Sequence, residues 1–167
     1  MISLSEELQS WFVPAGWFCG RKVPIADDIP AGHPAAEILA TFGGIVVPWP
    51  SSPNAPDEVP GVAMAFRRLA SNGPLVEEWE AQLGTELIGV ADVDTLHGEL
   101  YVASDGRCFG RSHVHPAFYY HGETYEEAFR SILLKEPRAR PMLAPDQTSV
   151  RLYGIEVTVD SAELYRY

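Results

Sequence analysis

A run of short β-rich segments separated by turn signals constrains the fold of this chain more than any other feature. The segments cover residues 87–93, 100–102 and 118–120. Asp105-Gly106 lies inside the run and is a strong signal for a tight turn. The turn leads into Cys108-Phe109, which is predicted to be the next strand. The middle of the chain is therefore predicted to fold as a β-meander.

Two capping boxes mark the starts of predicted helices. Ser3 and Glu6 have the spacing in which each side chain satisfies a free backbone N–H group, and the helix they open ends before Pro14. Thr124 and Glu127 repeat this spacing at the start of a later helix, whose apolar positions form the clearest amphipathic pattern in the chain. Both patterns predict helices with one buried face.

Two further helices are predicted from the residues at their ends. One begins at Pro34, where the missing N–H costs nothing, and stops at Gly43-Gly44. The other follows Gly73-Pro74 and stops at Gly84. Helices and strands fall into separate blocks rather than alternating, and this arrangement is typical of the α+β class.

The remaining segments are less regular. Residues 45–47 read as a short strand, and residues 48–61 contain five prolines and are predicted to be a loop. Residues 62–66 alternate large and small side chains, which fits a strand or a helical turn. A short basic linker is expected at residues 137–141, and one or two strands at residues 150–159.

The charge balance narrows the classes of partner. The chain has 23 acidic and 12 basic residues among its 167, a net charge of −11. A nucleic-acid surface needs a clustered excess of Lys and Arg, so we expect no nucleic-acid binding and no docking on an anionic membrane. The acidity is concentrated between Asp57 and Glu99, where nine acidic residues face two basic ones, while residues 130–140 are locally basic. This distribution favours a basic partner or a solvated surface.

The chain has no apolar run long enough to span a bilayer, and its first residues lack the pattern of a signal peptide. We therefore expect a cytoplasmic location. Cys19 and Cys108 are far apart in sequence and are expected to be free thiols.

Motifs for catalysis, metals and cofactors are weak. His113 and His115 follow Cys108, but a zinc site needs a fourth ligand at recognisable spacing and none is nearby. Asp92 and Asp94 have the residue type of an acid/base pair, although paired carboxylates at turns are more often solvated. Neither a dinucleotide loop nor a phosphate loop is present. We therefore predict no catalytic residue, no metal and no cofactor.

The tryptophans divide into two groups. Trp11 and Trp79 fall on predicted helix faces and are expected in the core. Trp49 lies between two prolines in the predicted loop. It is either an exposed anchor at an interface or a cover for the edge of the sheet.

Several short motifs occur together in a characteristic order and spacing. They are Ala15-Gly16-Trp17, Gly20-Arg21, Phe42-Gly43-Gly44-Ile45, Leu83-Gly84, Glu86-Leu87-Ile88-Gly89-Val90, Leu100, Asp105-Gly106-Arg107 and Gly122-Glu123-Thr124-Tyr125-Glu126-Glu127-Ala128. In this respect the chain resembles the third subfamily of the SUKH superfamily of bacterial immunity proteins, over roughly residues 4–135. It departs from the pattern at Cys108-Phe109, where members commonly have Val-Tyr, and at Ile88, where Pro is frequent.

The resemblance implies a mixed, largely antiparallel sheet flanked by helices. We expect a SUKH-like immunity domain at residues 1–136. Residues 137–167, which fall outside the resemblance, are expected to form a Pro-containing linker and a C-terminal β extension packed on the same domain. Members of the superfamily are encoded beside polymorphic toxins and neutralise them by direct binding, and many of these toxins act on nucleic acids and have basic clefts. The resemblance carries over no catalytic residue.

The expected function is therefore neutralisation of a cognate toxin with a basic surface. The residues predicted to contact it are Glu77, Glu78, Glu80, Asp92, Asp94 and Trp49. Two alternatives remain open. The chain is an acidic regulatory module that binds another protein, or it is a small-molecule enzyme whose site is formed by Asp92, Asp94, His113 and His115. The enzyme requires at least three of these groups in one pocket.

Overall fold

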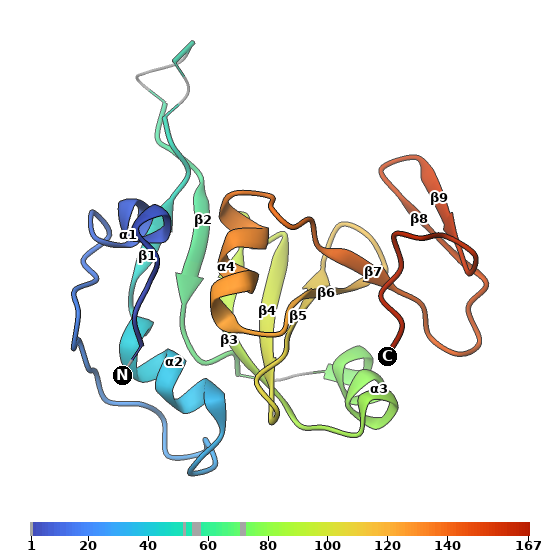
Figure 1. Cartoon of the computed structure of the whole chain (residues 1–167), viewed down its shortest axis with the longest axis horizontal. Coiled ribbons are helices and arrows are strands. Elements are labelled where there is room, and N and C mark those ends of the chain that lie inside the picture. Colours follow the sequence, from blue (N-terminus) through green and yellow to red (C-terminus); the bar gives the residue numbers. More distant parts are fainter. Residues whose placement is uncertain (1, 52, 55–57, 71–72) are drawn as a thin grey trace.

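A computed structural model describes residues 2–51, 53–54, 58–70 and 73–167 (Figure 1). It contains four helices and nine strands in the described ranges. The helices are α1 (Glu6–Phe12), α2 (Pro34–Phe42), α3 (Gly73–Leu83) and α4 (Tyr125–Leu133). The strands are β1 (Val46–Pro48), β2 (Val62–Phe66), β3 (Leu87–Val93), β4 (Gly98–Ala103), β5 (Cys108–Ser112), β6 (Phe118–Gly122), β7 (Arg140–Met142), β8 (Ser149–Leu152) and β9 (Ile155–Thr158).

Seven strands form one sheet in the order in which they occur along the chain, from β1 to β7. Each neighbouring pair is antiparallel, and β8 and β9 form a separate antiparallel hairpin. The predicted meander and the α+β class are therefore confirmed. The expectation of a mixed sheet gives way to a fully antiparallel one in the described part of the chain, because every sheet connection returns the chain beside the strand it has just left.

Alternating side chains of the strands build two separate cores. In β4, Leu100 and Val102 face one side of the sheet, while Tyr101 and Ala103 face the other. This is the period of two that a pleated strand imposes. Because both faces are covered, all four of these side chains are buried.

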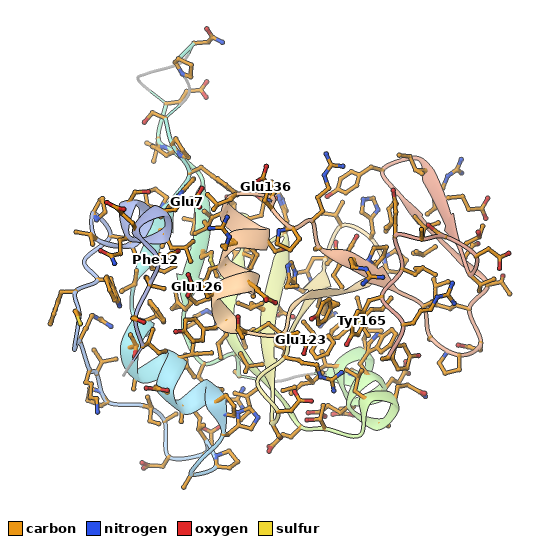
Figure 2. All side chains as sticks on the ribbon, viewed as in Figure 1. Glu7, Phe12, Glu123, Glu126, Glu136 and Tyr165 are labelled. Carbon is orange, nitrogen blue, oxygen red and sulfur yellow. The ribbon has the colours of Figure 1, made fainter. Side chains whose placement is uncertain are left out.

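Four phenylalanines form the centre of the larger core. Phe12 of α1, Phe42 of α2, Phe66 of β2 and Phe129 of α4 have ring centroids 5.2 to 5.8 Å apart in every pairing. Offset and edge-on pairs at this spacing are favourable beyond the burial of their surface. The cluster therefore joins three helices to the same face of the sheet (Figure 2, where Phe12 is labelled).

The other face is covered by α3 and by the end of the chain. Trp79 of α3 stacks on Phe118 with ring centroids 5.2 Å apart, and Tyr167 packs edge-on against Trp79 at 5.4 Å. Trp79 is buried, as predicted, whereas Trp11 is only half-buried. Trp17 is also buried and belongs to the larger core.

The two predicted capping boxes have different outcomes. Thr124 caps α4, since its Oγ1 accepts a hydrogen bond from the N–H of Glu127 at 3.3 Å. The box at Ser3 is wrong. The first helix begins at Glu6 with Ser5 as its N-cap, and the Ser5 N–H donates at 3.2 Å to the carboxylate of Glu126 in α4. A residue from a distant part of the chain thus replaces the local cap.

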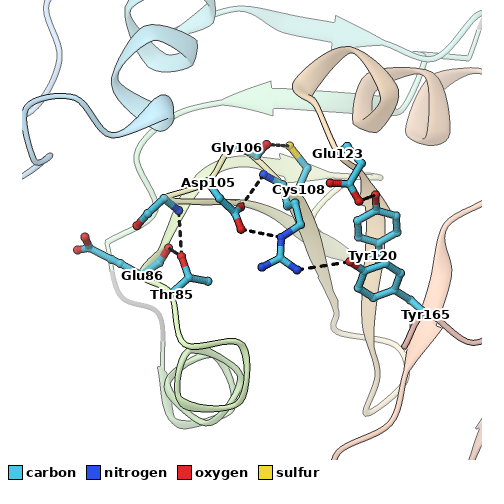
Figure 3. A network of polar contacts seen from close by, with 10 residues as sticks. Thr85, Glu86, Asp105, Gly106, Cys108, Tyr120, Glu123 and Tyr165 are labelled. Atoms are coloured by element: carbon cyan, nitrogen blue, oxygen red, sulfur yellow. Dashed lines mark hydrogen bonds and ion pairs between the residues drawn. The ribbon is translucent and has the colours of Figure 1, made fainter. Parts of the chain in front are cut away.

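The C-terminal part of the chain attaches along the β6–β7 side of the sheet. The segment predicted to be a basic linker contains β7, which pairs with β6. Tyr165 stacks on Tyr120 of β6 with ring centroids 3.8 Å apart (Figure 3). The Arg107 guanidinium donates at 3.4 Å to the Tyr165 hydroxyl, and Arg140 donates to the Leu164 carbonyl. Aromatic stacking and arginine contacts therefore hold the tail on the sheet.

Residues 62–66 form strand β2, so the helical-turn alternative is wrong. Part of the predicted loop at 48–61 lies outside the described residues. Cys19 is exposed and Cys108 is buried, and both are free thiols as predicted. In the part of the chain that the structure describes, no helix combines the length and apolar character that a membrane crossing requires.

Candidate functional site

The acidic residues of α3 that were predicted to contact a partner differ in whether their carboxylates already have a hydrogen-bond partner within the protein. Glu77 and Glu78 are exposed, because the opposite side of the helix carries the buried Val76 and Trp79. Glu80 has a structural role, because its Oε1 accepts a hydrogen bond from the N–H of Leu87 at 2.7 Å and so links α3 to the start of β3. The free negative charge of α3 is therefore concentrated at Glu77 and Glu78.

Asp92 is enclosed within the sheet. Its side chain is only 9% exposed, and it forms a two-point ion pair with Arg67, whose Nε and a terminal nitrogen donate at 2.5 and 3.0 Å. Paired arginine–carboxylate contacts of this kind satisfy a buried charge. Asp92 thus has little surface to offer a partner.

Asp94 and Trp49 are brought together, although 45 residues separate them. The Trp49 Nε1–H donates to the Asp94 carboxylate at 3.1 Å. Trp49 is half-buried, packs edge-on against Trp11 at 6.0 Å, and has the Lys135 ammonium 5.0 Å from its ring centroid. This packing favours the expectation that Trp49 covers the edge of the sheet.

The residues of the enzyme alternative face different partners. Asp92 is bound to Arg67, the His113 ring lies 3.4 Å from the Glu99 carboxylate, and the His115 ring packs edge-on against Tyr153 at 4.4 Å. Among the described residues, no group of His, Cys, Asp and Glu side chains is arranged to hold a metal ion. Burial raises the pKa of the Cys108 thiol, which disfavours the reactive thiolate.

A second acidic surface lies along α1 and α4, outside the acidic stretch noted in the sequence. Glu7 of α1 lies beside the last turn of α4, and Glu123 and Glu126 lie at the start of α4 (Figure 2). Glu6 and Glu127 are their neighbours in the sequence. Glu7 pairs with Arg130 at 2.5 Å, and Glu126 accepts the hydrogen bond from Ser5. Counting charges along the sequence misses this surface, because its two halves are more than a hundred residues apart.

Two adjoining grooves lie at the end of the sheet where the β3–β4 and β5–β6 turns meet the β8–β9 hairpin. The turn groove has a volume of about 210 Å³ and includes Asp94, His97, Glu99, Arg111 and Val114. The hairpin groove has a volume of about 510 Å³ and includes Arg138, Arg140, Leu152, Ile155 and Val157. Tyr119, Ala139 and Tyr153 line both grooves, so the two form one continuous depression.

Two ionisable side chains in the turn groove are shifted by burial. The pKa of His121 is lowered to about 4, mainly by burial and additionally by the Lys135 ammonium. Burial raises the pKa of Tyr119 to about 12. His121 is therefore neutral near pH 7, and its Nδ1 lies 3.2 Å from the Ser131 hydroxyl.

Several exposed apolar residues around these grooves were not predicted from the sequence as contact residues. They are Leu96, Val114, Tyr153 and Ile155. A usable signal was present at Tyr153-Gly154, which separates two β-rich segments where a tight hairpin turn normally has Asn-Gly. A tyrosine in that position is unexplained by turn chemistry.

Comparison with known proteins gives one result. The family model described as SUKH-3 immunity protein matches residues 4–135. No curated protein and no solved structure matches the chain. The match includes α1 to α4 and β1 to β6, which are the four helices and six of the seven strands of the main sheet in the described residues. It covers more than half of the chain, which therefore belongs to the SUKH-3 immunity protein family.

Proposed function

We propose that this protein binds a cognate bacterial toxin directly and neutralises it, and that the toxin acts on nucleic acid. Membership of the SUKH-3 immunity protein family carries the proposal. The net charge of −11 supports it, because a protein that cleaves or modifies nucleic acid needs a basic cleft to hold its substrate. An acidic protein can occupy that cleft or steer toward it.

The exposed acids of α3 are the predicted steering surface. Glu77 and Glu78 project from a helix that has no Lys, Arg or His. Surface charges of one sign attract a partner of the opposite sign over a Debye length and raise the association rate more than the affinity. We therefore assign Glu77 and Glu78 to the encounter step, with Asp94 and Trp49 as further contacts.

Co-expression tests the function itself. A toxin domain taken from the reading frame next to the gene for this chain is induced in a bacterial host with and without the protein, and colony formation is counted. Rescue by this chain, and none by an immunity protein from an unrelated toxin locus, is the expected result. Failure to rescue, with both proteins produced and soluble, would contradict the proposed function.

Charge reversal tests the steering surface. The double variant Glu77→Lys/Glu78→Lys should slow association with the toxin domain roughly tenfold at low salt and less at high salt, as measured by stopped-flow fluorescence. The matched control is Asp27→Lys/Asp160→Lys, which changes the net charge equally at two exposed positions on other parts of the surface. Glu80 is left intact because it bonds the Leu87 N–H. Equal slowing by both double variants would show that only total charge matters.

A further inference from the structure

Two large apolar side chains are exposed at positions where the backbone disfavours them. Tyr153 at the tip of the β8–β9 hairpin has φ of 49° and is 79% exposed, and Leu96 in the β3–β4 turn has φ of 70° and is 64% exposed. Left-handed backbone is costly for bulky residues, and tight turns favour Asn, Asp or Gly there. Neither the turn nor the core explains why these residues are a tyrosine and a leucine.

Tyr153 lines the depression, and Leu96 lies in the turn beside it. Tyr153 is part of the lining of both grooves, whereas Leu96 lines neither but stands between Asp94 and His97, which line the turn groove. Val114 and Ile155 add exposed apolar surface from the β5–β6 turn and from β9. Apolar side chains that remain in water next to a concave surface are typical of the centre of a protein interface.

The hairpin groove is lined by Arg138, Arg140 and Glu163, so its charged lining has a net positive charge although the chain as a whole is acidic. Arg138 is exposed and makes no hydrogen bond or ion pair with the residues that the structure describes. Arg140 is held by the Leu164 carbonyl, and Arg111 lies 3.7 Å from Glu99. Arg140 is held in place by a neutral carbonyl, and Arg138 has a guanidinium that is free to pair with a partner, for which a carboxylate is the natural complement.

We propose that this depression is the anchoring site for the toxin, and that it receives an apolar side chain flanked by a carboxylate. The inference rests on the proposed function and names the part of the surface that holds the bound partner. The acidic helix α3 accelerates the encounter, whereas the depression determines how long the complex lasts. The hairpin lies beyond residue 135, outside the segment that the family model matches.

Replacing Tyr153 or Leu96 by asparagine, which the turn conformation favours, separates an effect on toxin binding from an effect on folding. Tyr153→Asn keeps a left-handed turn that Asn and Gly favour, and Leu96→Asn does the same in the β3–β4 turn. Each variant should retain or increase thermal stability while raising the dissociation rate from the toxin domain about tenfold or more. The matched control is Val46→Ala, an exposed apolar residue in β1 at the other edge of the sheet, and it should leave the dissociation rate unchanged.

The dissociation rates of all variants are measured on a biosensor that carries an immobilised, inactivated toxin domain. The same measurement tests the Arg138 guanidinium. Arg138→Glu should raise the dissociation rate at least tenfold, and Arg138→Lys should restore most of the lifetime. Wild-type dissociation rates for Tyr153→Asn, Leu96→Asn and Arg138→Glu would overturn the anchoring site, while rescue of cells by the wild type would leave the proposed function standing. Absence of any binding by the wild type would overturn both.

Discussion

The part of the chain that matches the family and the segment that follows it are stabilised in different ways. The matched part is built on Phe12, Phe42, Phe66 and Phe129, which contact one another at the centre of three helices and the sheet. The C-terminal segment has a smaller core around Val150, Val157 and Leu164, and it is fastened by the stack of Tyr165 on Tyr120. Substitutions in the phenylalanine cluster should unfold the protein, whereas those in the C-terminal core or its tyrosine stack should loosen or reshape a surface.

The largest effect is expected from opening the phenylalanine cluster. Phe129→Ala removes a fully buried ring that contacts the other three, and it should lower the free energy of unfolding by about 3–5 kcal/mol. Urea denaturation followed by tryptophan fluorescence measures the loss. Phe129→Leu fills most of the volume and should cost clearly less. A loss below about 1 kcal/mol for the alanine variant would show that this cluster is not the main support of the fold.

Acid should weaken the matched part through His121. Its pKa is lowered to about 4 in the folded protein, so the unfolded chain, whose histidine pKa is near 6.5, binds the proton more readily. Stability is therefore complete above about pH 6.5 and is lost as the pH falls toward 4, by roughly 2 to 3 kcal/mol. His121→Asn keeps a hydrogen-bonding group near Ser131 and should make the unfolding free energy less dependent on pH over this interval. Identical dependence of the unfolding free energy on pH in the wild type and in His121→Asn would contradict the role of His121 in this loss of stability.

The smallest effect is expected from releasing the tail. Tyr165→Ala removes the stack on Tyr120 and should lower the free energy of unfolding by about 1 kcal/mol. Hydrogen exchange followed by mass spectrometry should show faster exchange in β7 and the tail, with unchanged protection in β3 and β4. Tyr165→Phe is the control, since it retains the ring. Faster exchange throughout the sheet would mean that the two regions unfold as one unit.

The sequence predicted elements better than it predicted the contacts between distant elements. Local signals placed the start of α4 at Thr124 and the start of α2 at Pro34. The capping box at Ser3 failed because Glu126, 121 residues away, supplies the bond to Ser5. The basic linker contains an edge strand that includes Pro141, which an edge tolerates because a proline needs no partner for an N–H group.

In the candidate site, too, the sequence predicted individual residues but not the contacts between distant elements. Trp49 and Asp94 could each be selected from local sequence, but the bond between them depends on two turns meeting at one end of the meander. Asp92 could be selected for its charge, while its enclosure by Arg67 depends on the pairing of β2 with β3. Tyr153 escaped notice because its exposure becomes informative only when its left-handed backbone is known.

The order of the strands has a consequence for how the protein is made. Since β1 to β7 pair in the order in which they are synthesised, each strand pairs with the strand that precedes it in the chain, with one helix between them at β2–β3 and at β6–β7. Pairing between segments close in sequence closes small loops and speeds folding. The last strand and the tail then add to a sheet that already exists. For the toxin-neutralising function proposed above, this topology would shorten the delay between translation and protection.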